Sequence, residues 1–447
     1  MIRKIIGFLW GDLSNQELKK FGLLAAGFFF LIGSWWPLKT LKDSIFINMV
    51  GPLHLPEAKI VSLFIFFPLV LLYSKLVDHF SKEKLMYVFI GAFTIIGLIL
   101  VFFLRHPTIG LQNTQVDPSR IIGWAFYLFC ESYISLILAL YWSFINDITT
   151  PESAKKGYGL IIFGTQLGGF LFTLLGNYLS YDASQYAFSA PLVAFISIMM
   201  FSGVALIVFI LKHVVDYKTL ISYEEEIGAD KEISPEEEVK VGFFEGLRLL
   251  LTHPYVMGIF VLIFFQEIVS TMMYFQLNFL AKTTYQEPGL VNKFLFDFAL
   301  CVQIVACLFG LVGTSFFQRK LGIRTSLIAY PLLLGIFIVG YFLHPNLQTI
   351  FYVMLVAKAL GYALNQPAKE VLYIPTSKNI KYKSKAWIDM FGMRFAKATG
   401  SVINRLAGPV VALTCSMAFG FIALWIFIAS LIGNTFRRAV SNKKLIE

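Results

Sequence analysis

Seven ionisable side chains interrupt stretches of sequence that are otherwise strongly apolar. They are Lys42, Glu131, Glu267, Lys358, Asp389, Arg394 and Lys397. A charge near the middle of a bilayer costs roughly 2.5 to 3.5 kcal/mol on insertion scales, so charged residues inside membrane spans are expected to be functional. Because four of the seven are positive, they predict a binding site for an anion such as a phosphate or a carboxylate.

The composition indicates which class of protein carries these charges. The chain has 447 residues, of which 57% are hydrophobic and 14% charged, and its mean hydropathy is +0.72. A soluble domain has about 25% charged residues, so this composition predicts an all-α membrane protein in contact with the lipid bilayer. The formal net charge is +10, but the basic residues lie beside the apolar stretches, as membrane anchoring requires, and we expect no nucleic-acid partner.

Twelve windows of mostly apolar residues are long enough to be membrane spans, which need about 20 residues. Residues 213–253 form the one long polar stretch between them and contain two runs of three glutamates, which we interpret as a solvated loop. We therefore predict two six-helix halves, residues 1–212 and 254–447, joined by a charged cytoplasmic linker, residues 213–253. The windows lie near residues 21–48, 59–78, 85–104, 120–146, 157–180, 186–212, 254–281, 294–317, 325–343, 347–373, 386–412 and 415–436.

The distribution of basic residues over the short loops and the tails predicts the orientation of the spans. Most Lys and Arg residues fall on the side of the two termini, and only a few fall on the opposite side: Lys59, Arg105, Arg120, Lys282 and Lys293. Because positive charge is enriched in cytoplasmic loops, we expect both termini to be cytoplasmic.

A short basic segment follows the second window and another follows the eighth. These segments, residues 74–84 and 315–324, are each predicted to form a tight turn between consecutive helices. The first resembles the loop between the second and third helices of the major facilitator superfamily. That resemblance implies two six-helix repeats with the substrate near the midplane between them. It also implies that the first, fourth, seventh and tenth helices line the cavity, and those windows hold Lys42, Glu131, Glu267 and Lys358.

The depth of these charges supports a midplane site. Glu131, Glu267, Lys358 and Lys397 lie about eleven to thirteen residues into their windows, or roughly 16 to 20 Å deep. Asp389 lies only about three residues into its window, near the cytoplasmic side. The alternative is that the charges form internal ion pairs, for instance Glu131 with Lys358, although pairing and substrate binding can coexist.

Other residues with possible chemistry are interpreted as structural. The sequence has no phosphate-binding GxxxxGK[ST] loop and no GxGxxG motif, its six histidines lie near loops, and its four cysteines lie in apolar runs without metal-type spacing. We therefore expect no catalytic group, no metal and no cofactor, and a protein that is not an enzyme. Aromatic pairs such as Tyr274 and Phe275 are interpreted as packing residues, and Gly164, Gly168 and Gly400 as sites of close helix packing.

Four segments carry a more specific resemblance. Residues 38–44 read Leu-Lys-Thr-Leu-Lys-Asp-Ser, residues 367–375 Pro-Ala-Lys-Glu-Val-Leu-Tyr-Ile-Pro, residues 383–389 Lys-Ser-Lys-Ala-Trp-Ile-Asp, and residues 394–401 Arg-Phe-Ala-Lys-Ala-Thr-Gly-Ser. These segments resemble motifs of the ATP/ADP translocases of plastids and obligate intracellular bacteria. The sequence departs from the family pattern at Gln366, where the family commonly has Asp.

The resemblance implies an integral membrane nucleotide transporter, most simply an ATP/ADP antiporter that works by alternating access as a monomer in a bacterial inner membrane. Its positive residues would contact phosphates, and its two glutamates would hold the lysines of the empty site or gate the change of state. Two alternatives stay open: a proton-coupled importer of nucleotides or another organic anion, and a membrane-bound sensor whose acidic loop is the functional part. The implied substrate-binding residues are Lys42, Glu131, Glu267, Lys358, Arg394 and Lys397.

Overall fold

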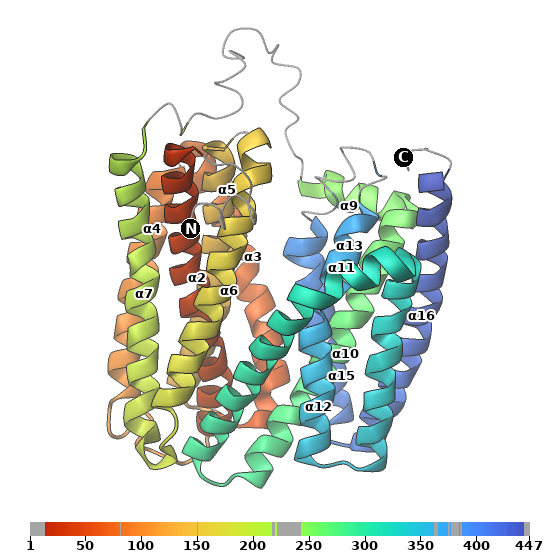
Figure 1. The fold of residues 1–447 in the computed structure, drawn as a ribbon. Coiled ribbons are helices and arrows are strands. Elements are labelled where there is room, and N and C mark those ends of the chain that lie inside the picture. Colours follow the sequence, from red (N-terminus) through yellow and green to blue (C-terminus); the bar gives the residue numbers. More distant parts are fainter. Residues whose placement is uncertain are drawn as a thin grey trace. The chain divides into compact units, whose positions relative to one another are not determined.

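The described part of the chain is built of helices. The computed structural model describes residues 14–80, 82–149, 151–216, 220, 243–361, 365–373, 376, 384 and 387–441. No β-strand occurs among these residues, which confirms the all-α prediction (Figure 1). In chain order the elements are α2 (Asn15–Met49), η1 (Pro52–His54), α3 (Leu55–His79), α4 (Lys82–Leu104), α5 (Ile121–Asp147), α6 (Pro151–Leu179), η2 (Ala183–Gln185), α7 (Tyr186–Val214), α9 (Phe243–Thr252), α10 (Pro254–Thr284), α11 (Pro288–Leu343), α12 (Leu347–Leu360), α13 (Gln366–Leu372), η7 (Ile388–Gly392), α15 (Met393–Ala407) and α16 (Val411–Ser441).

The helices are those of a multi-pass membrane protein. Within the described residues, ten helical segments are long and apolar enough to cross a membrane. The other two predicted windows fall on shorter helices. The tenth window begins with α12, which has 14 apolar residues, and the eleventh covers the π-helical η7 and α15. α15 is too short and too polar to count as a membrane span, because it has 15 residues and carries Arg394, Lys397 and Arg405, which reduce its mean hydropathy.

The prediction of a tight turn at residues 315–324 is wrong, because the helix α11 continues through these residues. This helix has 56 residues and contains two apolar stretches, Pro288–Ala306 and Ile323–Leu343. A straight helix of that length would measure about 84 Å, and Figure 1 shows α11 bending over between its two stretches. The residues between them include no proline, and their three glycines, Gly310, Gly313 and Gly322, weaken a helix by about 1 kcal/mol each without blocking its hydrogen bonds. The other predicted turn is confirmed, since α3 ends at His79 and α4 begins at Lys82.

The described helices group into two compact units. Unit 1 comprises described residues within Met1–Val50, Phe64–Glu238 and Glu287–Leu300, and unit 2 those within Gly51–Leu63, Val239–Gln286 and Cys301–Glu447. The start of α3 therefore belongs to unit 2 and the start of α11 to unit 1. The predicted boundaries of the halves stay a prediction, and most of the acidic linker lies outside the described residues.

The first helix of each predicted half is central to its unit. In unit 1, α2 packs against α5, α6 and α7, and in unit 2, α10 packs against α12, α15 and α16. Glycines allow the closest of these contacts. A Cβ at Gly168 on α6 would lie 2.2 Å from the carbonyl oxygen of Phe29 on α2, and one at Gly400 on α15 would lie 3.2 Å from that of Ile268 on α10. The prediction that these glycines permit close helix packing is confirmed.

α2 holds one predicted site residue near its end. The helix begins with a capping box, in which the Ser14 hydroxyl accepts a hydrogen bond from the Glu17 amide and the Glu17 carboxylate accepts one from the Ser14 amide. It continues through Pro37 to Met49, and the chain then turns at Gly51, which has a φ of 110°. Lys42 thus lies on the last two turns of a long buried helix.

Candidate functional site

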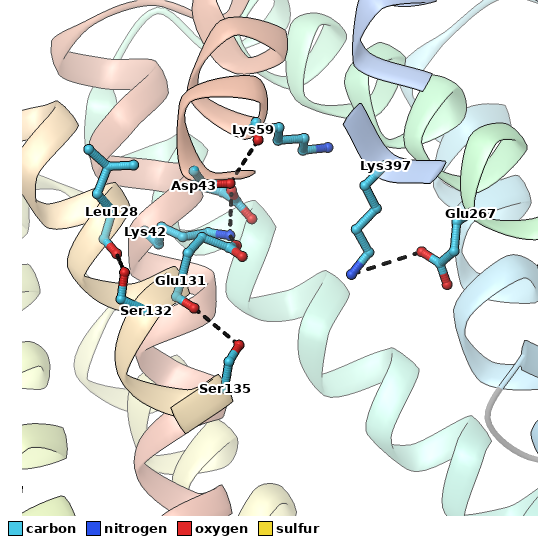
Figure 2. Close-up of polar contacts among 10 residues, drawn as sticks. Lys42, Asp43, Lys59, Leu128, Glu131, Ser132, Ser135, Glu267 and Lys397 are labelled. Atoms are coloured by element: carbon cyan, nitrogen blue, oxygen red, sulfur yellow. Dashed lines mark hydrogen bonds and ion pairs between the residues drawn. The ribbon is translucent and has the colours of Figure 1, made fainter. Parts of the chain in front are cut away.

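Lys42 is the centre of the charged cluster in unit 1. Its ammonium forms an ion pair with the Glu131 carboxylate of α5, and a second carboxylate oxygen, Oδ1 of Asp43, lies 3.6 Å away (Figure 2). The Lys42 side chain is only 8% exposed, whereas that of Glu131 is 32% exposed. Because one ammonium faces two carboxylates, this cluster carries a net charge of −1 when all three groups are ionised.

α5 presents two contacts to Lys42 from one of its faces. Tyr127 and Glu131 are four residues apart, so their side chains lie one turn apart on the same side of the helix. The Lys42 nitrogen lies 4.5 Å from the centre of the Tyr127 ring. The buried ammonium is therefore enclosed by two carboxylates and the face of an aromatic ring, and each of these favours a positive charge.

Glu267 on α10 and Lys397 on α15 form the predicted pair in unit 2. The Lys397 nitrogen lies 3.9 Å from Glu267 Oε2, and Figure 2 shows the lysine side chain extending toward the glutamate. The Glu267 side chain is 15% exposed, whereas that of Lys397 is 48% exposed. Such a long and half-exposed contact is looser than the Lys42 pair, so Lys397 has room to meet another anion.

The same face of α10 meets two further lysines. Lys358 at the end of α12 donates a hydrogen bond to Ser270 Oγ at 3.0 Å. Lys369 on α13 donates one to Gln266 Oε1 at 2.9 Å, and this oxygen also accepts a 2.6 Å hydrogen bond from Asn365. Ser270 follows Gln266 by four residues and therefore lies one helical turn further along α10.

Tyr274, a turn beyond Ser270, lies near a fourth lysine. The Lys59 nitrogen of α3 is 5.3 Å from the centre of the Tyr274 ring, and the Lys358 nitrogen is 5.7 Å from it. Lys397, Lys358, Lys369 and Lys59 all lie near enough to the Glu267 carboxylate to act on it electrostatically. One carboxylate among four lysines leaves a net charge of +3 when all are ionised. We call these four lysines the α10 lysine cluster.

The structure brings together four of the six predicted site residues as two pairs, Lys42 with Glu131 and Glu267 with Lys397. Lys358 joins the second pair through the adjacent turn of α10. Arg394 is half-buried on α15, three residues before Lys397. The alternative pair of Glu131 with Lys358 would join residues of different units and stays a prediction.

Two lysines of the cluster were not predicted as site residues. Lys59 was interpreted as one of the few basic residues on the side of the membrane opposite the termini. It lies on the first turns of α3, with its ammonium beside Tyr274. Lys369 lies in the segment 367–375 that resembles the translocases, and this match is the sequence signal that could have identified it. Tyr274 was interpreted as a packing residue, but its half-buried ring lies near two ammonium groups.

The remaining candidates have structural roles or lie outside the description. Tyr141 packs against Phe28 and donates a hydrogen bond to the Leu24 carbonyl at 3.1 Å, as a packing residue would. Cys130 and Cys415 are buried within helices. In the part of the chain that the structure describes, no three His, Cys, Asp or Glu residues are grouped as metal ligands would be. The side chain of Asp389 is outside the described set.

The sequence has relatives along nearly its whole length. It matches the profile of the TLC ATP/ADP transporter family over residues 1–355 and 349–436. It is 25% identical to ADP,ATP carrier protein 1 of Chlamydia pneumoniae, over 97% of this chain and 94% of that protein. It is 23% identical to ADP,ATP carrier protein 3 of Rickettsia prowazekii, over 90% of this chain and 89% of that protein.

The fold is similar to that of solved transporters. A nucleoside transporter superposes with a TM-score of 0.58 at 15% identity, over 95% of this chain and 99% of that one. A D-xylose-proton symporter superposes with a TM-score of 0.59 at 14% identity, over 92% of this chain and 96% of that one. These likenesses confirm the predicted major-facilitator-like fold.

Proposed function

The chain belongs to the TLC ATP/ADP transporter family, whose profile covers nearly all of it, and from this premise we propose that it is a carrier that exchanges ATP for ADP by alternating access. The observation that carries the proposal is the α10 lysine cluster, in which four lysines meet one face of α10 around a single glutamate. Several lysines in a membrane protein interior are strongly stabilised by an anion that bears several charges, as the phosphates of a nucleotide do.

The two charged clusters have different roles in this proposal. Lys358 and Lys397 bind the phosphates together with Arg394, because they belong to the unit whose cluster has unbalanced positive charge. Glu267 partly neutralises these lysines when the site is empty. Lys42 is already compensated by Glu131 and Asp43, so this cluster responds to the nucleotide through its single exposed partner, the Glu131 carboxylate. All six predicted site residues thus belong to the substrate site.

Exchange rather than uniport follows from the charge of the empty site. A cluster with a net positive charge is costly to enclose in a low-dielectric interior, and a bound nucleotide reduces that cost. A substrate shifts a conformational equilibrium only through its different affinities for the two states. The loaded carrier therefore changes state readily and the empty carrier slowly, which couples the outward movement of one nucleotide to the inward movement of another.

The setting of the carrier belongs to the same proposal. It acts as a monomer in a bacterial inner membrane. Both termini lie in the cytoplasm, an orientation that the distribution of basic residues favours. It is a carrier and not an enzyme, so the nucleotide crosses the membrane chemically unchanged.

Proteoliposomes loaded with ADP test the proposed exchange. External labelled ATP is expected to enter loaded vesicles far faster than empty ones, because the return step requires a bound anion. Unlabelled ATP, ADP, GTP, CTP and UTP added in competition would define the preferred base. If none of the labelled nucleoside triphosphates enters loaded vesicles, the nucleotide proposal is wrong.

The same vesicles distinguish exchange from proton-coupled import. Uptake into empty vesicles that requires a pH gradient and is lost in the Glu267→Gln variant would favour a proton-coupled importer. Uptake that depends on internal ADP and not on the pH gradient supports exchange. Lys19→Gln, an exposed substitution on α2, serves as the control variant for expression and reconstitution.

A further inference from the structure

The α10 lysine cluster contains two residues, Lys59 and Lys369, to which the proposed function gives no role. Lys59 comes from the start of α3, in the segment Gly51–Leu63 that belongs to unit 2. Lys369 comes from α13 and is buried. Both lysines act on Glu267 electrostatically, as Lys358 and Lys397 do. Two lysines from two other elements therefore share one carboxylate with the expected phosphate ligands.

The four lysines are arranged in order along a single helix face. Lys369 meets α10 at Gln266, Lys397 at Glu267, Lys358 at Ser270, and Lys59 at Tyr274. The eight residues from Gln266 to Tyr274 correspond to about 12 Å along the helix axis. The positive charge is thus spread along the helix, whereas a single carboxylate or a single phosphate would contact only one position along it.

Each of the two end lysines has a contact with a neutral group. Lys369 donates to the side-chain oxygen of Gln266, and Lys59 lies over the ring of Tyr274. An amide oxygen or an aromatic face stabilises an ammonium less than a carboxylate or phosphate oxygen does. A phosphate that approached either lysine would therefore be a stronger partner than the Gln266 oxygen or the Tyr274 ring.

We infer that Lys59 and Lys369 are additional substrate-binding residues, which bind the two ends of a chain of linked phosphates along the α10 face. Lys358 and Lys397 bind its middle part. This inference rests on the proposed function and makes it more specific, because a site of this length selects nucleotides by the number of their phosphates. ATP and ADP engage the end lysines, whereas AMP does not reach both.

Nucleotide competition against labelled ADP tests this assignment. Lys59→Gln and Lys369→Gln are each expected to raise the KM for ATP by about tenfold, the effect of losing one charge-assisted hydrogen bond. The inhibition constant of AMP should change by less than the KM for ATP in at least one of the two variants. Lys59→Arg and Lys369→Arg keep the charge and should recover most of the affinity.

Tripolyphosphate provides a second readout that does not depend on transport. It carries the linked phosphates without the nucleoside, so it should bind the purified wild-type protein in calorimetry and bind both glutamine variants about tenfold more weakly. Lys282→Gln is the matched control, because Lys282 lies on α10 two turns beyond Tyr274, outside the cluster. Thermal unfolding of each variant, measured alongside, identifies any that fails to fold.

The possible outcomes separate the two proposals. If the wild-type protein exchanges nucleotides and both lysine variants bind ATP and tripolyphosphate as the wild type does, the assignment of Lys59 and Lys369 is wrong and the proposed function stands. If the wild type exchanges no nucleotide but tripolyphosphate binding still falls in both variants, the proposed function is wrong and the lysine assignment stands. Lys369 is buried. If Lys369→Gln does not fold, the binding of ATP and tripolyphosphate by Lys59→Gln alone tests the assignment.

Discussion

Charged residues of the same type have different surroundings in the two units. Lys42 faces two carboxylates and is almost completely buried, whereas Lys397 faces one carboxylate at 3.9 Å and is half exposed. A lysine whose charge is already balanced gains little from a bound anion, and a lysine with an incomplete set of partners gains much. The role of each charged residue therefore depends on its partners as well as on its own type.

A double-mutant cycle on Lys42 and Glu131 tests this difference. Lys42→Gln should lower the stability of the purified protein because it leaves the Glu131 and Asp43 carboxylates without their cation, and Glu131→Gln should lower it less because Asp43 still compensates Lys42. The double variant should be more stable than the sum of the single effects predicts, with a coupling of about 1 to 3 kcal/mol measured by denaturant unfolding in detergent. Lys19→Gln on the exposed part of α2 is the control. Strictly additive effects would contradict the inferred pair.

Close packing of a few helices positions the charged residues. α2 and α6 approach through Gly164 and Gly168, whose added Cβ atoms would lie 2.5 Å and 2.2 Å from carbonyl oxygens of α2. Such a contact fixes the rotation of α2, and that rotation decides which side of the helix Lys42 occupies. In unit 2, α10 has the corresponding place, and Gly400 permits the close approach of α15, which carries Lys397.

Alanine substitutions on two helices test the α2–α6 contact. Gly168→Ala should destabilise the protein by about 1 to 3 kcal/mol, the usual cost of overpacking a tight core. Gly91→Ala on α4 is the matched control, since a Cβ there would meet nothing within 4 Å. It should be neutral or slightly stabilising because alanine is the better helix former. Equal melting temperatures for both variants would show that the close contact is unimportant.

At the scale of the whole molecule, two helices belong to more than one unit. α3 begins in unit 2 and continues in unit 1, and α11 begins in unit 1 and continues in unit 2. Ion pairs and hydrogen bonds hold both starts. Glu57 of α3 lies 3.2 Å from the Arg405 guanidinium of α15 and 2.6 Å from His54, and Asp297 of α11 accepts a 2.6 Å hydrogen bond from Asn177 of α6. Because α3 and α11 run through both units, movement of the units during transport would require these helices to bend or these attachments to break.

Cross-linking the start of α3 to α15 tests this expectation. Cysteines at Glu57 and Arg405, in a chain whose native cysteines are replaced by alanine, would be joined by a short bifunctional thiol reagent. Cross-linked protein should retain its melting temperature and lose nucleotide exchange, and a cleavable reagent should allow exchange to recover. The single-cysteine variants treated in the same way are the controls. Full exchange by the cross-linked protein would show that this contact need not open.

Much of the fold could be predicted from the sequence. Runs of about 20 apolar residues can only be satisfied as helices in a bilayer, so most of the spans and the all-α class followed from composition and pattern. The prediction of a turn at residues 315–324 was wrong for a local reason. Basic residues were interpreted as marking a loop, but the residues between the two apolar stretches of α11 include no proline, and their glycines weaken a helix without blocking it.

The sequence also identified most charged residues of the candidate site, because a charge in an apolar window is costly wherever its helix packs. It could not identify their partners, since pairing depends on helix rotation and on the close packing that glycines such as Gly168 permit. Lys59 illustrates this limit. Its position near the start of an apolar run is also that of an ordinary flanking charge, and only the packing of α3 against α10 places its ammonium beside Tyr274. The sequence by itself therefore determined the type and depth of the charges, and the tertiary structure decided which of them are balanced and which are in excess.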